Sequence, residues 1–497
     1  MKQGDLFGTE KVFMLPTGNR RAYRTEVRAS AVAKKSCNGD GAKGTQEGGY
    51  VKEGKLEEEP AGVPETATQA GEIRARWAWV EPSVWTERML TALEQGVKGS
   101  KWYSMMDKVY AMPNLRAAFR KVKANGGAAG VDHLTIERYE QRLEENLEKL
   151  SRKLRDDRYR PKAVRRVWIP KPGSKEKRPL GIPTVEDRVV QGALLNVLEP
   201  IFERDYAEQS YGFRPNRGCK DALRRVDQLL KAGYHWVIDA DLKSYFDTIP
   251  HGWMIKRVEE KVTDGRVIEL LQRYLKQDVM DGMQSWTPEG GTPQGAIISP
   301  MLSNIYLDPL DHQMAQGGYQ MVRYADDFVI LCRDEEEAHE ALDRVRTWTV
   351  NAGLTLHPEK TRIVNADEKG GFDFLGYHFE RGMKWPRKKS LDKFRDTIRE
   401  KTKRTNGQSL QVIIGGLNRT LRGWFEYFKH SQASTFQLLD KWVRMRLRSI
   451  LRKRLGKTGR GRGRDHQRWP NAFFGEQGLI SLVSAHAAAR QSLMVNH

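Results

Sequence analysis

The segment that most constrains this chain is Met321–Ile330, in which an apolar run rises to two adjacent carboxylates, Asp326 and Asp327, and then resumes. This pattern predicts a β-hairpin with acid at its tip. Neighbouring carboxylates repel, and each raises the pKa of the other unless a cation lies between them. A hard cation such as Mg²⁺ binds one or two carboxylates and completes its shell with water and substrate phosphates. An ordinary aspartate-rich turn is the competing interpretation.

A second acidic segment lies upstream, at Trp236–Asp247, and predicts a strand that ends in acid and is followed by an aromatic turn. A third carboxylate at a neighbouring strand end would complete the requirement of two-metal phosphoryl transfer, in which two ions are held about 3.5–4 Å apart. Asp239 and Asp241 have the same strand parity, so both face the same side of the strand. Parity alone therefore leaves both as candidates for the third ligand.

Taken together, these motifs resemble the palm of reverse transcriptases, and specifically that of group II intron-encoded reverse transcriptases, or maturases. The resemblance covers roughly residues 85–470. One Tyr-Ala-Asp-Asp match would be weak, but many blocks in the family's order make coincidence implausible. The blocks are Ile169–Gly173, Lys177–Pro183, Ser210–Pro215, Asp241–Asp247, Thr292–Gly295, Ile298–Pro300, Tyr324–Asp327, His357–Thr361 and Phe374–Tyr377.

The resemblance implies an α+β fold of the right-hand polymerase type, with fingers and palm built from an antiparallel sheet plus helices and with an α-helical thumb. It implies that Asp241, Asp326 and Asp327 are the catalytic metal ligands, joined by the backbone carbonyl of Leu242. They would hold two Mg²⁺ ions, for which Mn²⁺ could substitute. Phe246, five residues past Asp241, matches the bulky residue that stacks under the sugar and excludes a 2′-hydroxyl. The expected substrates are therefore deoxynucleoside triphosphates.

Four further blocks offer residues that would position the nucleotide. Lys171 and Arg178 belong to a predicted β-hairpin and would face the triphosphate, since a guanidinium grips phosphate oxygens in a bidentate way and a lysine adds a point charge. A solvated basic hairpin is the alternative. Gln294 would hydrogen-bond the sugar or base, and Gly295 would let the backbone approach a ligand closely; the alternative is a plain strand-to-helix turn. Lys360 resembles the family's phosphate-facing lysine, and a solvated lysine at a helix C-terminus would read similarly.

Net charge agrees with a nucleic-acid enzyme. The chain of 497 residues has a formal charge of +21 and a pI near 9.7. Residues 381–470 contain 26 Lys and Arg against 6 Asp and Glu, so almost the whole excess lies in one segment. A basic region confined in this way is typical of contact with backbone phosphates, whereas merely solvated charge would be spread along the chain.

The three cysteines, Cys37, Cys219 and Cys332, stand far apart without paired spacing. This pattern argues against a disulfide framework or a zinc site and fits a reducing cytoplasm. No apolar run approaches the roughly 20 residues that cross a bilayer, and the N-terminus lacks a signal-peptide core. We therefore expect a cytoplasmic protein without a membrane partner.

Composition and periodicity also predict the domain organisation. Asp187–Leu198 predicts an amphipathic helix whose apolar face belongs to the core. The expected parts are a disordered or loosely ordered leader at 1–75, an N-terminal helical extension at 76–155, fingers and palm at 156–380, a helical thumb or maturase X domain at 381–455 and a basic DNA-binding tail at 456–497.

The resemblance implies an RNA-directed DNA polymerase that copies RNA into cDNA, with an RNA template, a DNA primer and target DNA as partners. It also implies binding to the protein's own group II intron RNA, which would assist splicing and mobility. Two alternatives stay open: a maturase that acts mainly as a splicing cofactor, and a host-adapted reverse transcriptase in DNA repair or phage defence. The late histidines lack nuclease spacing, so no HNH endonuclease domain is expected.

Overall fold

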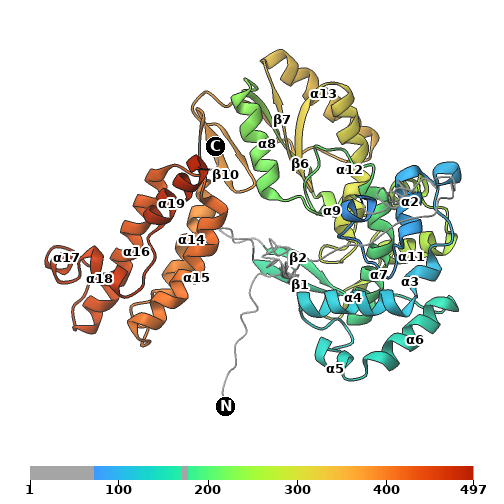
Figure 1. Cartoon of the computed structure of the whole chain (residues 1–497), viewed down its shortest axis with the longest axis horizontal. Helices are drawn as coiled ribbons and strands as arrows, with labels where there is room; N and C mark the ends of the chain where they lie inside the picture. The colour runs from blue at the N-terminus through green and yellow to red at the C-terminus, as the bar shows by residue number, and fades with distance from the viewer. Residues whose placement is uncertain (1–71, 171–176, 496–497) are drawn as a thin grey trace, which may run out of the picture.

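The computed structural model describes residues 72–170 and 177–495, except for the side chains of Lys98 and of residues 492–495. Helices come first, at residues 87–155. Strands and helices are then mixed from residue 164 to residue 386, and in the described residues only helices follow. Figure 1 shows these C-terminal helices as an orange and red arm at the left. The mixed architecture, with mainly antiparallel strand pairs, confirms the expected α+β class. Residues 1–71, which make up most of the predicted leader, lie outside the described residues.

The N-terminal part is helical. In α6, Leu147, Leu150 and Leu154 are buried, acidic residues occupy the first turn and basic residues the last. This distribution stabilises the helix through its dipole as well as through its apolar stripe. The elements of this part are α2 (Glu87–Gln95), η1 (Lys98–Ser100), α3 (Met106–Val109), α4 (Met112–Asn125), α5 (Ile136–Glu140) and α6 (Leu143–Arg155).

A four-stranded sheet follows, with the strand order β2-β1-β4-β5. Strands β1 and β2 form an antiparallel hairpin, which confirms the hairpin predicted from the sequence. The loop between them, residues 171–176, lies outside the described residues. The strands are β1 (Val164–Pro170), β2 (Lys177–Ile182), β4 (Val279–Asp281) and β5 (Gln284–Trp286).

A second four-stranded sheet, of order β6-β7-β3-β8, carries the acidic strand ends. Ile238 and Ile330 pack into the largest apolar core, together with residues of α12 and α13, whereas Val237 and Val329 pack against α8 on the other face. Because both faces of the central strands are covered, their apolar runs are continuous instead of alternating. The strands are β3 (Trp236–Asp241), β6 (Gln320–Tyr324), β7 (Asp327–Cys332) and β8 (Arg362–Asn365).

Seven helices of the described chain surround these two sheets. They are α7 (Val185–Glu203), α8 (Cys219–Lys231), α9 (Tyr245–Thr248), α10 (His251–Glu259), α11 (Gly265–Leu275), α12 (Ser299–Gln316) and α13 (Glu335–Asn351).

The helix predicted at Asp187–Leu198 is α7, and its apolar face lies in the core as expected. Its polar face is buried as well. Asp187 accepts hydrogen bonds from the Tyr159 and Thr184 hydroxyls, and Gln191 Oε1 accepts one from the Ile297 backbone N–H at 2.8 Å. Arg188 donates to the carbonyl of Ala128 at 2.8 Å. The polar side chains of α7 therefore hold three separate loops against the core, which periodicity alone does not reveal.

The C-terminal part joins a three-stranded sheet, of order β11-β10-β9, to the helical arm. Tyr377 Oη donates to the carbonyl of Tyr427, and Tyr427 Oη donates to the carbonyl of Leu375, both at 2.7 Å. The strands are β9 (Phe372–Phe374), β10 (Tyr377–Glu380) and β11 (Met383–Pro386). The helices are α14 (Lys388–Lys401), α15 (Leu410–Phe428), α16 (Ala433–Arg454), α17 (Arg464–Arg468), α18 (Asn471–Glu476) and α19 (Leu482–Val495).

Among the described residues, no helix combines the length and the apolar character needed to span a bilayer.

Candidate active site

The predicted acidic hairpin is confirmed as β6 and β7, joined by a tight turn. Ala325 in this turn has a positive φ of 59°, and Asp326 and Asp327 follow it. Strand β3 pairs antiparallel with β7, and in this register Asp241 lies opposite Asp327. The sheet thus brings together three carboxylate-bearing residues that are up to 86 positions apart in the sequence.

The electrostatics of this strand end favour a bound cation. Asp327 lies at the solvent-accessible start of β7, yet desolvation by the protein around its carboxylate, with the charges of Asp326 and Asp239, raises its pKa to about 7. Burial also raises the pKa of Asp326, and the charge of Asp241 adds to the effect. A cation between these carboxylates would remove this repulsion. Within the described residues, no group of three or more His, Cys, Asp or Glu side chains forms a preassembled metal site.

The two candidates for the third ligand have different partners. The guanidinium of Arg362 lies 3.4 Å from the carboxylate of Asp239, and the two residues lie opposite each other in the β3–β8 register. Burial raises the pKa of Asp239, and the charge of Arg362 opposes this shift. Asp241 instead forms an ion pair with Lys360, whose Nζ lies 2.5 Å from Asp241 Oδ2. Asp241 is therefore the carboxylate that faces Asp327.

Lys360 reaches Asp241 because the backbone after β3 is hydrogen-bonded to the segment that precedes Lys360. The backbone N–H of His357 donates to the carbonyl of Asp241 at 2.7 Å, and Lys243 N–H donates to the carbonyl of Thr355 at 2.8 Å. Leu242 lies between these two bonds, with a buried side chain. Lys360 lies in a turn, so the alternative of a lysine at a helix C-terminus is wrong.

The sequence analysis assigned no role to Arg323, whose side chain supports the acidic turn. Its guanidinium is fully buried, pairs with Asp311 and donates to Asn304 Oδ1 and to the carbonyl of Ala325, both at 2.9 Å. A charged residue inside the apolar run of β6 could have indicated this role, because a buried charge requires a partner. Asn304 is part of this support.

Gly212 is a second residue that the sequence analysis left without a role. A Cβ atom at this position would lie 2.2 Å from the Ala325 backbone nitrogen. The Asn304 side-chain amide donates to the Gly212 carbonyl at 2.8 Å, and Tyr211 N–H donates to the Arg323 carbonyl at 2.8 Å. The segment around Gly212 thus packs directly on the acidic turn, which leaves no room for a side chain there.

Of the two predicted triphosphate-binding cations, Arg178 is described and Lys171 is not. Arg178 lies on β2 opposite Ile169, and its side chain is exposed. Lys171 falls within residues 171–176, outside the described residues.

Gln294 and Gly295 dock against the hairpin that carries Arg178. The Gly181 N–H donates to the Gln294 carbonyl at 2.6 Å. Gly295 has a φ of 111°, and a Cβ there would lie 2.3 Å from the Gly181 carbonyl oxygen. The close backbone approach predicted for Gly295 is therefore made to strand β2. Burial raises the pKa of Asp247, opposed by the charge of Arg166 and by a hydrogen bond from the Gln294 side chain.

Phe246 lies on the short helix α9, immediately after the end of β3. Its ring is half-buried, packs against the main core and meets Tyr245 edge to face with 5.3 Å between ring centroids. Its carbonyl accepts a hydrogen bond from Thr292 N–H at 2.7 Å, which joins α9 to the segment of Gln294. The ring thus has one face in the core and part of its surface accessible.

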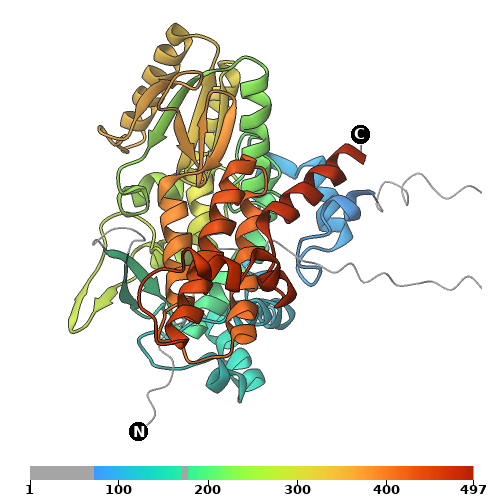
Figure 2. The ribbon, with the colours of Figure 1, turned by 90° about the vertical axis from the view of Figure 1, so that its left-hand side faces the viewer.

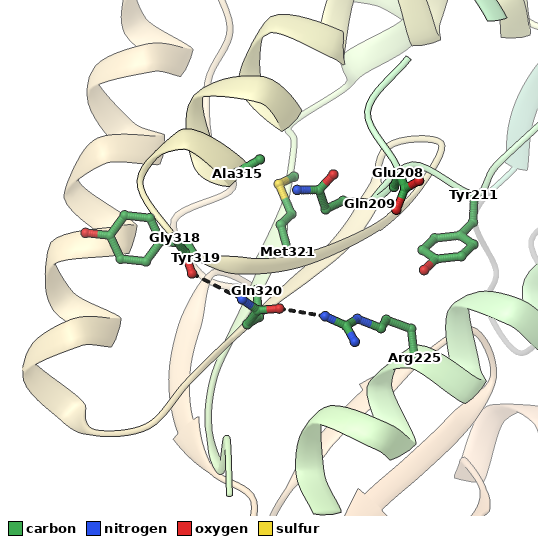
Figure 3. A pocket seen from close by; sticks show the side chains of 9 residues that line it. All are labelled: Glu208, Gln209, Tyr211, Arg225, Ala315, Gly318, Tyr319, Gln320 and Met321. Carbon is green, nitrogen blue, oxygen red and sulfur yellow. Dashed lines mark hydrogen bonds between the residues drawn. The ribbon is translucent and has the colours of Figure 1, made fainter. Parts of the chain in front are cut away.

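A separate cavity of about 520 Å³ lies at the opposite end of β6 from the acidic turn (Figure 3). Arg225 donates to Gln320 Oε1 at 2.7 Å across its wall, and Gln320 Nε2 donates to the carbonyl of Gly318 at 3.2 Å. Its lining contains none of the predicted site residues.

Comparison with known proteins agrees with this geometry. A family described as reverse transcriptase (RNA-dependent DNA polymerase) matches residues 169–379, and the group II intron, maturase-specific domain matches residues 391–469. The chain is 33% identical over 348 residues to protein YkfC of Escherichia coli K12, covering 62% of this chain and 86% of YkfC.

A second relative is the group II intron-encoded protein LtrA of Lactococcus lactis subsp. cremoris. It is 37% identical over 201 residues, and the match covers 40% of this chain but only 33% of LtrA. Among solved structures, a chain of a partial Cas6-RT-Cas1–Cas2 complex aligns at 23% identity over 50% of this chain and 41% of that chain, with a TM-score of 0.32.

The two family matches adjoin each other and lie on the two parts that the fold sets apart. The first covers the end of β1, strands β2–β8 and the acidic turn, and the second covers most of α14 and all of α15–α17 in the helical arm. RNA binding and the use of divalent metal ions accompany these families. The chain therefore belongs to the group II intron-type reverse transcriptases, RNA-directed DNA polymerases with a maturase-specific domain.

Proposed function

We propose that this protein copies RNA into DNA at the strand end formed by Asp241, Asp326 and Asp327, and that it binds group II intron RNA to assist splicing and mobility. The observation that carries the polymerase site is the pairing of Asp241 with Asp327 beside the turn that contains Asp326. Carboxylates from two adjacent strands are the donor set that two-metal nucleotidyl transfer requires.

The donor set fits two Mg²⁺ ions, or Mn²⁺, because hard cations prefer carboxylate oxygens. Asp241, Asp326 and Asp327 would hold them, with the Leu242 carbonyl as a further ligand. Bound ions would lower the pKa of the primer 3′-hydroxyl and neutralise the charge of the leaving pyrophosphate. The raised pKa of Asp327, caused by desolvation and by the charges of Asp326 and Asp239, supports this assignment, since a bound cation would offset these effects.

Five side chains would orient the incoming deoxynucleotide. Lys171 and Arg178, on the fingers hairpin, would neutralise the triphosphate, and Lys360 would leave Asp241 to contact a phosphate oxygen. Gln294 would hydrogen-bond the sugar or base. Phe246 would exclude a 2′-hydroxyl by steric clash. Catalysis in this arrangement rests on positioning and charge neutralisation.

The helical arm supports the second activity. Residues 391–469 match the maturase-specific domain, and this region carries most of the excess positive charge. We assign residues 76–155 to the N-terminal extension, 156–380 to fingers and palm, 381–455 to the thumb and 456–497 to a DNA-contacting tail. An RNA template with its DNA primer, the protein's own intron RNA and target DNA would be the partners.

Primer extension on an RNA template in Mg²⁺ tests the polymerase site. Asp241→Asn and Asp326→Asn should abolish extension, because each removes a metal ligand, while RNA binding stays within about twofold because the basic surface is unchanged. Asp343→Asn, an exposed carboxylate on α13, is the matched control. Full extension by either site variant would overturn the assignment.

A further inference from the structure

One face of the fingers sheet exposes two tryptophan rings with an arginine between them. Trp168 on β1 is 45% exposed and Trp286 on β5 is 38% exposed. The guanidinium carbon of Arg166 lies 4.6 Å from the Trp286 ring centroid and 5.7 Å from that of Trp168. We call this group the Trp-Arg-Trp stack. Figure 2 shows β4 and β5 as a yellow-green hairpin that projects from the lower left of the molecule.

The register of the sheet places all three side chains on the same face. Arg166 and Trp168 are two residues apart on β1, so they point the same way. Trp286 lies opposite Val279, which in turn lies beside Val164 of β1. Trp168 Nε1 also donates to Asp281 Oδ2 at 2.8 Å, which fixes the orientation of the indole ring. The exposed rings are therefore held in place before any ligand arrives.

The stack lies next to the proposed nucleotide site. Arg166 lies opposite Gly181 in the β1–β2 register, and Gly181 N–H donates to the Gln294 carbonyl. The charge of Arg166 acts on Asp247, which neighbours Phe246. A strand leaving the nucleotide site therefore passes within reach of the stack.

We propose that the Trp-Arg-Trp stack binds unpaired RNA nucleotides by stacking their bases on the two indole rings. Exposed aromatic rings beside a cation are the usual platform for single-stranded nucleic acid, since every base has a flat face and every nucleotide carries a phosphate. Contiguous exposed apolar surface, as opposed to single scattered side chains, marks an interaction site. The proposal goes beyond the polymerase assignment, because it concerns RNA binding at a separate surface, which is measured without nucleotide addition.

Fluorescence anisotropy on the full-length chain tests the proposal with three probes: a blunt RNA–DNA duplex, the same duplex with a 5′ RNA overhang, and a separate single-stranded RNA. Trp168→Leu and Trp286→Leu keep an apolar side chain but remove the flat ring. Each should weaken binding of at least one unpaired probe by roughly tenfold, while the blunt duplex binds as before. Trp168→Phe, which keeps a ring, should restore most of the affinity.

The pattern across probes identifies the source of the RNA. Loss confined to the overhang duplex assigns the stack to the template strand, and loss confined to the separate RNA assigns it to another RNA segment. Trp253→Leu on α10, 50% exposed and also next to a lysine, should change neither and serves as the control. Unchanged binding of both unpaired probes, or an equal loss for the blunt duplex, would overturn the proposal and leave the stack as a surface for a non-RNA partner or for sheet packing. The primer-extension test with Asp241→Asn is independent of these binding measurements, so failure of the stack proposal would leave the polymerase assignment in place.

Discussion

Lys360 and Asp241 form an ion pair, 2.5 Å between Nζ and Oδ2, although 119 residues separate them in the sequence. The Lys360 ammonium is thus bound to the Asp241 carboxylate that we assign to metal binding. A cation that binds Asp241 must therefore displace Lys360, which is then available for a phosphate oxygen. The side chain can make this change because it is 62% exposed.

Lys360→Ala should lower the Mg²⁺ concentration for half-maximal primer extension, because the competing ammonium is absent. The shift should be at most about fivefold, since an exposed ion pair contributes roughly 1 kcal/mol or less. The maximal rate should fall as well, because a phosphate contact is lost. An Mg²⁺ titration at saturating nucleotide measures both, with Lys256→Ala as the control. A higher Mg²⁺ requirement would contradict the competition.

Phe246→Val should increase ribonucleotide incorporation by roughly one to several orders of magnitude, at about 1.4 kcal/mol per tenfold, with little loss for deoxynucleotides. Catalytic efficiency for both nucleotide types, measured beside a melting curve, separates this role from packing. Phe119→Val, at a fully buried ring on α4, should instead lower the melting temperature without changing sugar preference. If Phe246→Val behaves like Phe119→Val, the ring belongs to the core and its loss costs stability.

Asp187 gives a pH dependence of stability. Burial raises its pKa to about 6, against the opposing hydrogen bonds from Tyr159 and Thr184. Because the folded-state pKa lies above the unfolded value, the contribution to stability is fully present below about pH 4 and is lost as pH rises through 6. The loss is at most about 3 kcal/mol, at 1.36 kcal/mol per pKa unit.

Asp187→Asn should remove this dependence, since its amide cannot ionise. The difference in unfolding free energy between wild type and variant, measured by denaturant titration from pH 4 to pH 7.5, should move in favour of the variant as pH rises. Asp343→Asn, at an exposed carboxylate, is measured alongside as the control. A difference for Asp187→Asn that moves in favour of the wild type with rising pH would show that the folded state prefers the charged carboxylate.

Arg323→Met should lower the free energy of unfolding by about 3–5 kcal/mol, because it leaves Asp311 as an unpaired buried charge. The double variant Arg323→Met/Asp311→Leu should recover much of that loss, since apolar groups of similar volume replace both charges. Its polymerase activity should nevertheless stay low, because the Ala325 carbonyl has lost its donor. Recovery of activity together with stability would show that Arg323 does not position the turn.

The acidic hairpin and the strand before Phe246 were predictable because both are continuous apolar runs that end in carboxylates. Their juxtaposition followed from the family resemblance, not from local pattern. The residues that support the acidic turn were not predictable in the same way. Gly212 contacts Ala325 across 113 positions, and such a contact has no periodicity to detect. The burial of the polar face of α7 was not predictable for the same reason, since spacing shows which residues share a face but not what packs on that face.

The site residues divide by whether the structure describes them. Asp241, Asp326 and Asp327 lie where the sequence placed them, and Arg178 lies on the expected hairpin. Lys171 falls outside the described residues, so its proposed contact rests on the resemblance. The Trp-Arg-Trp stack had no sequence signal of its own, because it forms only when β5 is brought beside β1 through β4.

The hydrogen bonds from Tyr377 Oη to the Tyr427 carbonyl and from Tyr427 Oη to the Leu375 carbonyl have a mechanical consequence. They fasten the last turn of α15 to strand β10 and to the strained turn at Leu375, whose φ is 45°. Phe372, Phe374 and Phe379 of the three-stranded sheet pack with Val237 of β3 and Val329 of β7 in one apolar core, so the sheet is anchored on both sides. A load on the helical arm is therefore carried through this sheet into the strands that bear the acidic residues.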